Sequence, residues 1–329
     1  MNAEKYSPLS SIEYQKPQRE WGWQVAVYLY LAGIGAGSFA IGIFMGWLGY
    51  SPYSSRAILL WGPILVAIGA LFLILKLGIK RRFLNTVLNP KTSWLSRGFY
   101  ILSMCIIVGV VILGISILQL LGISTGNWSY LLTILDVTGF ILALATAIYT
   151  GILIQSVRYV SFWNTSLLPV LFTVSALSTG SMATILSTYV YDLIFYYEGY
   201  SVHMMHMIMN IEQVLVILEA LVLALYLFSR YRAEGQGKYS VRLLLSGNLK
   251  FVFWLGIVVS GFLFPTILEN IYSKFPEYPF LLFLTGAFLL VGGFFLRMGI
   301  IYAAIKERHP MHKMIEVLHN GSTLRQNGA

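Results

Sequence analysis

The chain has 329 residues, of which 57% are hydrophobic and 11% charged, and its formal net charge is +9. Soluble globular domains have about 45–50% apolar and about 25% charged residues, so this composition excludes an ordinary soluble enzyme and a disordered chain. The single cysteine, Cys105, excludes an internal disulfide, a cysteine-ligated iron–sulfur cluster and a c-type haem attachment site. An integral membrane protein remains, provided that the apolar residues form spans of about 20 residues.

Eight apolar stretches are long enough to cross a bilayer as helices. In chain order they are residues 24–48, 57–79, 98–121, 131–154, 166–190, 206–228, 251–268 and 280–303. The sequence therefore predicts an all-α integral membrane protein with eight transmembrane helices and a single polytopic domain, residues 1–329. Its parts are a polar N-terminal segment (1–20), spans one to four (21–154), spans five to eight (155–303) and a basic tail (304–329).

The basic residues are distributed unevenly between the two sides of this topology. Eight spans put both termini on one side, and 20 of the 22 lysine and arginine residues fall on that side, whereas Arg56 and Lys274 fall on the other. Basic residues accumulate in cytoplasmic loops, so the pattern predicts a multi-pass plasma-membrane protein with both termini in the cytoplasm. Basic residues spread this thinly form no patch for nucleic acid, and no nucleic-acid partner is expected.

Two stretches of small residues suggest an internal repeat. Residues 33–40 read GIGAGSFA and residues 176–183 read ALSTGSMA, which aligns Gly37-Ser38 with Gly180-Ser181. Both stretches cross the membrane in the same direction in the predicted topology, so two four-helix bundles in a 4+4 repeat are expected. Small residues also recur wherever membrane helices pack closely, and this simpler interpretation stays open.

The histidines do not suit a haem. A membrane cytochrome b needs axial histidines on different spans, but His203 and His206 lie together at one helix end and the other three histidines lie in the tail. The sequence thus predicts no haem, no iron–sulfur cluster and no metal site in this chain. If the protein handles electrons, a partner or a diffusible carrier must bring them.

Four ionisable residues lie inside the predicted spans, where such groups are costly and indicate function. They are Asp136, Glu212, Glu219 and Arg297. Glu212 and Glu219 are seven residues apart and share one helix face. One interpretation is a proton path that enters from the side opposite the termini. The alternative is a structural pairing, for example of Glu219 with Arg297, that holds helices together.

Two tyrosines, Tyr28 and Tyr149, lie about one turn or more inside the terminus-bearing side of their spans. A buried tyrosine hydroxyl needs a hydrogen-bond partner. A quinone carbonyl between apolar walls is one candidate partner, and a neighbouring backbone carbonyl is the simpler one.

Several motifs occur in a fixed order along the chain. They are WGW at 21–23 followed by Tyr28, LGIKRRF at 77–83, NPKTS at 89–93, YTGIL at 149–153, LPVLF at 168–172, SALSTG at 175–180 and GGFFLR at 292–297. In this order and spacing they cover most of the chain. The ordered set resembles the polysulfide reductase membrane-subunit family, also called NrfD-like.

The resemblance implies a quinone-reactive membrane anchor without a redox centre of its own. It implies an iron–sulfur electron-transfer subunit on the membrane face, connected to a molybdopterin catalytic subunit as in sulfur and polysulfide reductases. Electrons would pass between that subunit and a lipid quinone, of menaquinone type or another, with proton transfer coupled to it. The quinone-binding residues expected on this basis are Tyr28, Tyr149, Trp21 and Gln24.

The resemblance also bears on one tyrosine and one basic segment. Tyr28 lies where the family can place a quinone-contacting histidine, and tyrosine keeps the hydrogen-bond donor but loses a proton acceptor near neutral pH. Lys80, Arg81 and Arg82 suit the docking of an acidic iron–sulfur partner. Family members often serve exported catalytic subunits on the outer face, whereas the charge distribution puts the terminus-bearing side in the cytoplasm.

Two other functions stay open. A secondary transporter or proton-conducting channel is suggested by the repeat and the buried carboxylates, and it predicts broken helices at corresponding positions of both halves. The second open function is that of a pure anchor, which tethers partner subunits and binds no quinone.

Overall fold

The computed structural model describes residues 18, 20–50, 61–77, 93–120, 129–195, 200–233 and 236–306. Within these residues, seven helices are long and apolar enough to cross a membrane. They are α1 (Trp23–Trp47), α5 (Trp94–Leu120), α6 (Ser129–Gln155), α7 (Leu167–Phe195), α8 (Tyr200–Arg232), the continuous pair η2 (Val252–Leu263) and α10 (Phe264–Lys274), and α11 (Pro279–Tyr302). The protein is therefore an all-helical, multi-pass membrane protein.

The second predicted span, residues 57–79, falls on α3 (Trp61–Leu77), an apolar helix of 17 residues. The residues on both sides of α3 lie outside the described part of the chain, so its full length is not defined and the count of eight spans stays a prediction. The sixth and seventh predicted spans are longer in the structure, because α8 begins at Tyr200 and α10 continues to Lys274. A short helix, α9 (Gly237–Leu245), follows α8.

The long helices carry apolar side chains on the outside of the molecule as well as in its core. Leu75, Ile107, Ile134, Val214 and Ile217 are all more than half exposed. A soluble protein rarely exposes an apolar surface of this extent. Helices of 24 to 33 residues are about 36 to 50 Å long, enough to cross a hydrocarbon core of about 30 Å, and these side chains face the lipid.

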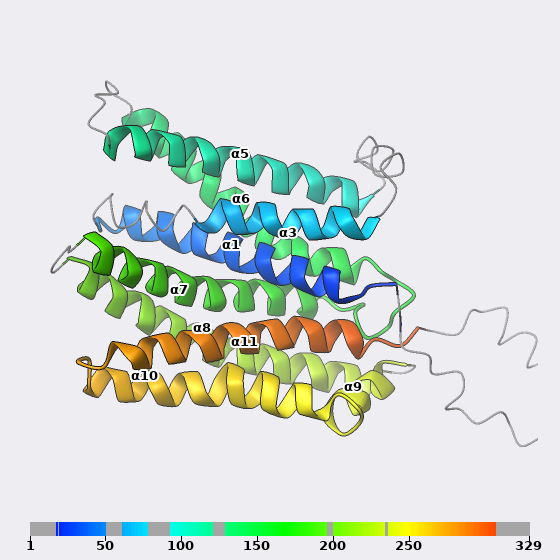
Figure 1. Cartoon of the computed structure of the whole chain (residues 1–329). Coiled ribbons are helices and arrows are strands. Elements are labelled where there is room, and N and C mark those ends of the chain that lie inside the picture. Colours follow the sequence, from blue (N-terminus) through cyan, green and yellow to red (C-terminus); the bar gives the residue numbers. More distant parts are fainter. Residues whose placement is uncertain are drawn as a thin grey trace, which may run out of the picture.

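The helices form two groups that meet at α1 and α7 (Figure 1). In the first group, α1 packs on α3, α3 on α5, α5 on α6, and α6 on α1. In the second, α7 packs on α8, α8 on η2, η2 and α10 on α11, and α11 on α7. Contacts between α6 and α7 and between α1 and α11 flank the central α1–α7 contact.

Gly37 and Gly180 form the closest part of the α1–α7 contact. A Cβ atom at Gly37 would overlap the backbone carbonyl of Ala176, and one at Gly180 would overlap the backbone of Gly37 and Ser38. Only glycine allows the two backbones to approach this closely. The two positions that align in sequence thus lie against each other in space.

The ends of α1 and α11 are defined by local interactions. α1 ends at Trp47 and is followed by Gly49, whose φ of 86° is left-handed. The amide of Tyr50 bonds back to the carbonyl of Met45, as in a Schellman motif. At the other end of the bundle, the amide of Gln18 bonds to the carbonyl of Ala304 at 3.0 Å. The segment before α1 is therefore attached to the segment after α11.

An exposed ion pair between Glu20 and Lys306 adds to this attachment, and the hydroxyl of Tyr159 donates to Glu20 at 2.8 Å. Hydrogen bonds from Lys306 and Tyr159 lower the pKa of Glu20 below its usual value. Both ends of the described chain consequently lie on the same side of the bundle.

Candidate functional site

Tyr28 on α1 and Tyr149 on α6 lie together inside the first group of helices. Their side chains are 0% and 1% exposed, and the two phenol groups are close enough to interact electrostatically. Neither hydroxyl has a hydrogen-bond partner among the described residues. Their surroundings are apolar, because both belong to a core cluster with Val25, Leu29 and Leu153. The structure thus brings together the two tyrosines that the sequence singled out.

Glycines on two neighbouring helices allow close approach in this region, one to the ring of Tyr149 and the other to the backbone of α1. The ring of Tyr149 lies directly on Gly98 of α5, where any Cβ atom would overlap it. On α3, Gly69 lies against the backbone of α1, with the Tyr28 carbonyl 3.2 Å from where a Cβ would be. The sequence alone did not show that Gly98 lies against Tyr149.

Trp21 and Gln24 lie at the terminus-bearing end of the same region. Trp21 is half-buried and its ring packs edge-on to that of Trp163 at a centroid distance of 6.1 Å. Gln24 is also half-buried and lies one helical turn before Tyr28, on the same face of α1. Both residues are positioned between the tyrosine pair and the end of the bundle.

Arg297 on α11 is fully buried, and its guanidinium connects three helices. It donates to the backbone oxygen of Leu29 at 3.3 Å, to Oγ of Ser175 at 3.0 Å and to the backbone oxygen of Gly293 at 2.8 Å. Leu29 is the residue after Tyr28. Arg297 therefore lies directly beside the segment of α1 that carries the tyrosine pair.

The rest of the guanidinium is enclosed by aromatic rings and by a glycine. The rings of Tyr30 and Phe172 have centroids 5.8 and 5.7 Å from its central carbon. A Cβ atom at Gly33 would lie 2.8 Å from Nη2 of Arg297, and this nitrogen has no hydrogen-bond partner in the described part of the chain. Gly33 therefore provides the space that the guanidinium occupies.

Glu219 on α8 is 5% exposed and lies beside the hydroxyls of Ser175 and Ser178. Arg297 is near enough to act on it electrostatically. Glu219 and Arg297 share Ser175 as a neighbour without forming a direct ion pair.

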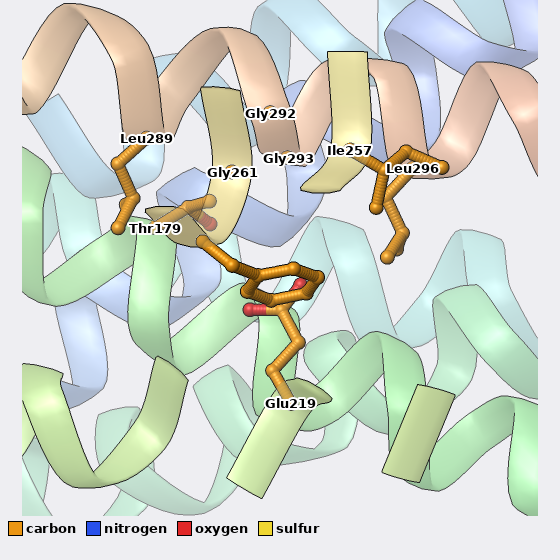
Figure 2. Close-up of a pocket in the computed structure, with 9 residues that line it drawn as sticks. Thr179, Glu219, Ile257, Gly261, Leu289, Gly292, Gly293 and Leu296 are labelled. Carbon is orange, nitrogen blue, oxygen red and sulfur yellow. The ribbon is translucent and has the colours of Figure 1, made fainter. Parts of the chain in front are cut away.

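A small cavity adjoins the carboxylate of Glu219, as Figure 2 shows. About 10 Å³ is open to the centre of a water molecule, enough for about one water. Much of its wall is glycine backbone, because Gly261 of η2 meets Gly292 of α11 with no side chain between them. Other residues around the cavity are Thr179, Ile257, Phe262, Leu289, Gly293 and Leu296.

Glu212, one heptad before Glu219 on α8, is fully buried and faces a carboxylate that the sequence interpretation missed. That carboxylate is Glu269 of α10, which is 1% exposed. The predicted seventh span ended at residue 268, one residue too early to include it. The signal available was the continuation of the apolar pattern through Ile271 and Tyr272.

Asp136 is not part of this carboxylate group. It is half-buried on α6, which packs on α1, α5 and α7, whereas the glutamates lie on α8 and α10. The predicted docking residues Lys80, Arg81 and Arg82 lie outside the described residues.

The arrangement provides two kinds of chemistry on either side of Arg297. Two buried phenol hydroxyls can donate hydrogen bonds to a carbonyl oxygen that enters between apolar side chains. Glu219, the serine hydroxyls and a water-sized cavity can hold and pass a proton. Arg297 joins the two regions, because it contacts Leu29 on one side and Ser175 on the other.

Comparison with known proteins gives a consistent assignment. The family described as "Polysulphide reductase, NrfD" matches residues 13–307. The C chain of polysulfide reductase from Wolinella succinogenes is 27% identical over 278 residues, which are 76% of the present protein and 82% of that one. Protein NrfD of Escherichia coli is 27% identical over 305 residues, 86% of the present protein and 94% of that one. The NrfD homolog of Haemophilus influenzae is 26% identical over 319 residues, 89% of the present protein and 96% of that one. Because the family match extends over most of the chain, this integral membrane protein belongs to the NrfD polysulphide reductase family.

Proposed function

We propose that the protein is the quinone-binding membrane anchor of a multi-subunit molybdopterin and iron–sulfur oxidoreductase of the sulfur or polysulfide reductase type. It passes electrons between the quinol pool and an iron–sulfur subunit. The observation that carries the proposal is the pair of buried hydroxyls on Tyr28 and Tyr149, which lie in an apolar region without partners among the described residues. Buried hydroxyls without partners are costly, and a carbonyl ligand would satisfy them.

The residues around the pair suit a lipid quinone, of menaquinone type or another. Tyr28 and Tyr149 donate hydrogen bonds to the quinone oxygens, while Leu29 and Leu153 provide apolar contact. Trp21 and Gln24 line the approach from the terminus-bearing side. A quinone bound there takes up or releases two electrons and two protons, and neither tyrosine is a good proton acceptor near neutral pH. Protons must therefore move through other groups.

The second part of the proposal is a proton path through Glu212, Glu219 and Arg297 towards the tyrosine pair. Glu219 lies beside a water-sized cavity, and Arg297 connects its surroundings to the backbone next to Tyr28. Asp136 lies in the first helix group and would form a separate branch of this path.

The partner subunits are expected on the terminus-bearing face. An iron–sulfur subunit with acidic surface residues docks there against Lys80, Arg81 and Arg82, and it connects to the molybdopterin catalytic subunit. The proposed topology has eight spans in the plasma membrane with both termini in the cytoplasm, arranged as a 4+4 repeat. The matching order of helix contacts in the two groups and the contact between the aligned Gly37 and Gly180 support the repeat.

The transporter alternative has less support. It predicts interrupted helices at corresponding positions of both repeats. The π-helical segment η2 interrupts the seventh span, but α5, its counterpart in the first group, is α-helical from Trp94 to Leu120.

Conservative substitution of the tyrosines tests the quinone site. Tyr28→Phe and Tyr149→Phe each remove one hydroxyl without changing the ring. Losing a hydrogen bond worth about 0.5–1.5 kcal/mol predicts a roughly two- to tenfold decrease in quinol-linked turnover. Activity of the catalytic subunit with an artificial electron donor is expected to stay at the wild-type level, because the donor bypasses this site.

Tyr130→Phe is the matched control, since Tyr130 is 78% exposed near the start of α6. It is expected to leave both activities unchanged. If quinol turnover is unaffected in both the Tyr28 and Tyr149 variants while the complex is intact, the quinone site is not at these tyrosines.

A further inference from the structure

Glu212 and Glu269 come from different helices and face each other inside the second helix group. They are 0% and 1% exposed, and their carboxyl groups are close enough to interact with each other. If both groups were ionised, their oxygens could only accept hydrogen bonds and could not donate one to each other. In keeping with this, both oxygens of Glu212 and Oε1 of Glu269 find no hydrogen-bond donor among the described residues.

The π-helical geometry of η2 explains why Glu269 faces inward. Five buried residues of this span recur every four positions, namely Phe253, Ile257, Gly261, Pro265 and Glu269, and Gly256 and Ser260 are buried beside them. A step of four residues exceeds one turn of an α-helix, which has 3.6 residues. It falls short of one turn of a π-helix, whose hydrogen bonds close on the fifth residue. Every fourth residue therefore shifts around the helix axis in one direction along the π-helix and in the opposite direction along the α-helix. Because the two shifts offset each other, all five residues stay on one face of the span.

The surroundings of the pair supply no charge that would allow both carboxylates to be ionised. The apolar cluster beside Glu212 contains Met205, Ile208, Met209 and Val216. The ionisable groups that act electrostatically on Glu212 are the carboxyl groups of Glu269 and Glu219, which are themselves acidic. No arginine, lysine or histidine among the described residues lies within ion-pair distance of either glutamate. Two facing negative charges in such a site repel each other and are poorly solvated.

We propose that Glu212 and Glu269 form a carboxyl–carboxylate pair that shares one proton and is the outer proton-holding group of the path that leads to Glu219. One proton converts an acceptor into a donor, so that each carboxyl group satisfies the other. Glu269 is five residues from the end of α10, on the side opposite the attached chain ends, and Glu219 is seven residues beyond Glu212. The path therefore has an outer proton store, Glu212–Glu269, and an inner one at the cavity beside Glu219.

Transfer along this path is a simple exchange of protons. The pair accepts a proton from the outer side and becomes two carboxylic acids. It then gives one proton through water to the Glu219 carboxylate, while the Gln213 side chain, which lies beside Glu269, offers a hydrogen bond to the pair. The pair returns to one shared proton, and no other bond changes.

Infrared absorption of the full-length protein in lipid nanodiscs tests the shared proton. Protonated carboxyl groups have a carbonyl band separate from those of carboxylates and amides. We expect one band that changes in both Glu212→Gln and Glu269→Gln spectra and does not change in Glu277→Gln, the control on the exposed connection between α10 and α11. Two bands, each removed by one substitution, would mean two protons, and no such band would mean none. Either result overturns the proposal.

The place of the pair in a path rests on the proposed quinone function and needs a second measurement. In vesicles containing the complete complex, Glu269→Gln is expected to slow proton uptake during quinol turnover by about 100-fold, the lower end of the range for a proton-transfer group. Glu269→Asp, which keeps an ionisable group, is expected to restore part of the rate. Unchanged uptake in Glu269→Gln contradicts the path even if the infrared band is present. Failure of the quinone proposal would instead appear in the Tyr28 and Tyr149 variants and leave the infrared band unaffected.

Discussion

Arg297 and Gly33 are complementary in shape, and this relation changes the interpretation of the glycines in the first span. The pattern of Gly33, Gly35 and Gly37 indicated close packing of helix backbones. At Gly37 this is correct, because the backbone of α7 lies against it. At Gly33, however, the neighbour is a buried guanidinium from α11, 264 residues later in the chain. A single small residue thus makes room for a charged side chain.

Gly33→Ala is therefore expected to destabilise the protein through Arg297. The added Cβ would lie 2.8 Å from Nη2 and would displace the guanidinium from its hydrogen bonds. Crowding of this kind costs about 1–3 kcal/mol, measurable as a lower free energy of unfolding in mixed micelles. In an Arg297→Lys background, where no Nη2 is present, the cost of Gly33→Ala is expected to be smaller.

Gly114→Ala provides the control, since a Cβ at Gly114 on α5 would meet no atom within 4 Å. It is expected to be neutral or slightly stabilising, by up to about 1 kcal/mol, because alanine favours the helix. Equal costs of Gly33→Ala in the wild-type and Arg297→Lys backgrounds would show that the two positions do not interact.

Single residues inside the spans were largely predictable, whereas their partners were not. Tyr28, Tyr149, Glu212, Glu219 and Arg297 attract attention from the sequence alone, because polar groups are rare within apolar stretches. That Tyr149 lies on Gly98, or that Arg297 bonds to Ser175, depends on helix rotation and packing, which one sequence does not specify. Asp136 met the same criterion as the glutamates and yet lies in the other helix group.

At the level of elements, the helices themselves follow from the apolar pattern, but the π-helix of η2 does not. Nothing in the sequence of Val252–Leu263 marks its wider turn, and a regular α-helix was expected there. This segment lies in close contact with α11, where Gly261 meets Gly292 and Oγ of Ser260 donates to the carbonyl of Phe288 at 2.9 Å. Glu269 was missed for a different reason, because the predicted span ended at residue 268.

The α1–α7 contact allows a prediction about an element pair. In Gly37→Ala the new Cβ would overlap the backbone carbonyl of Ala176, which cannot rotate away as a side chain can. The helices must separate, and we expect a loss of about 3 kcal/mol or more in the free energy of unfolding, at the upper end for overpacked sites. Circular dichroism during thermal unfolding in detergent measures the effect. A melting temperature equal to that of the Gly114→Ala control would contradict the close packing.

At the level of the whole molecule, the two described ends lie on one side, where Gln18 bonds to Ala304 and Glu20 pairs with Lys306. An arrangement of this kind requires an even number of membrane crossings between the two ends. Seven spans are defined by length, so the predicted eighth span, which falls on α3, would make the number even. An even number is compatible with either orientation in the membrane, and the two orientations differ in which compartment the chain ends face.

Cysteine labelling determines that orientation, and the chain is well suited to it because its single cysteine, Cys105, is buried. A membrane-impermeant thiol reagent is applied to intact cells that produce either Ser322→Cys, in the basic tail, or Ser54→Cys, in the connection between the first two predicted spans. The positive-inside rule predicts that only the second reacts. Reaction at the tail instead would put the terminus-bearing side outside, as for anchors of exported catalytic subunits.

The contact between Gly37 and Gly180 has a consequence for the origin of the chain. A contact between equivalent positions of two repeats is self-complementary, so two separate copies of one four-helix unit could form it around a twofold axis. In the proposed 4+4 repeat, the smallest ancestor compatible with this contact would be a homodimer, later fused by gene duplication. The tyrosine pair of one half and the carboxylates of the other would then be two specialisations of an interior that was once identical.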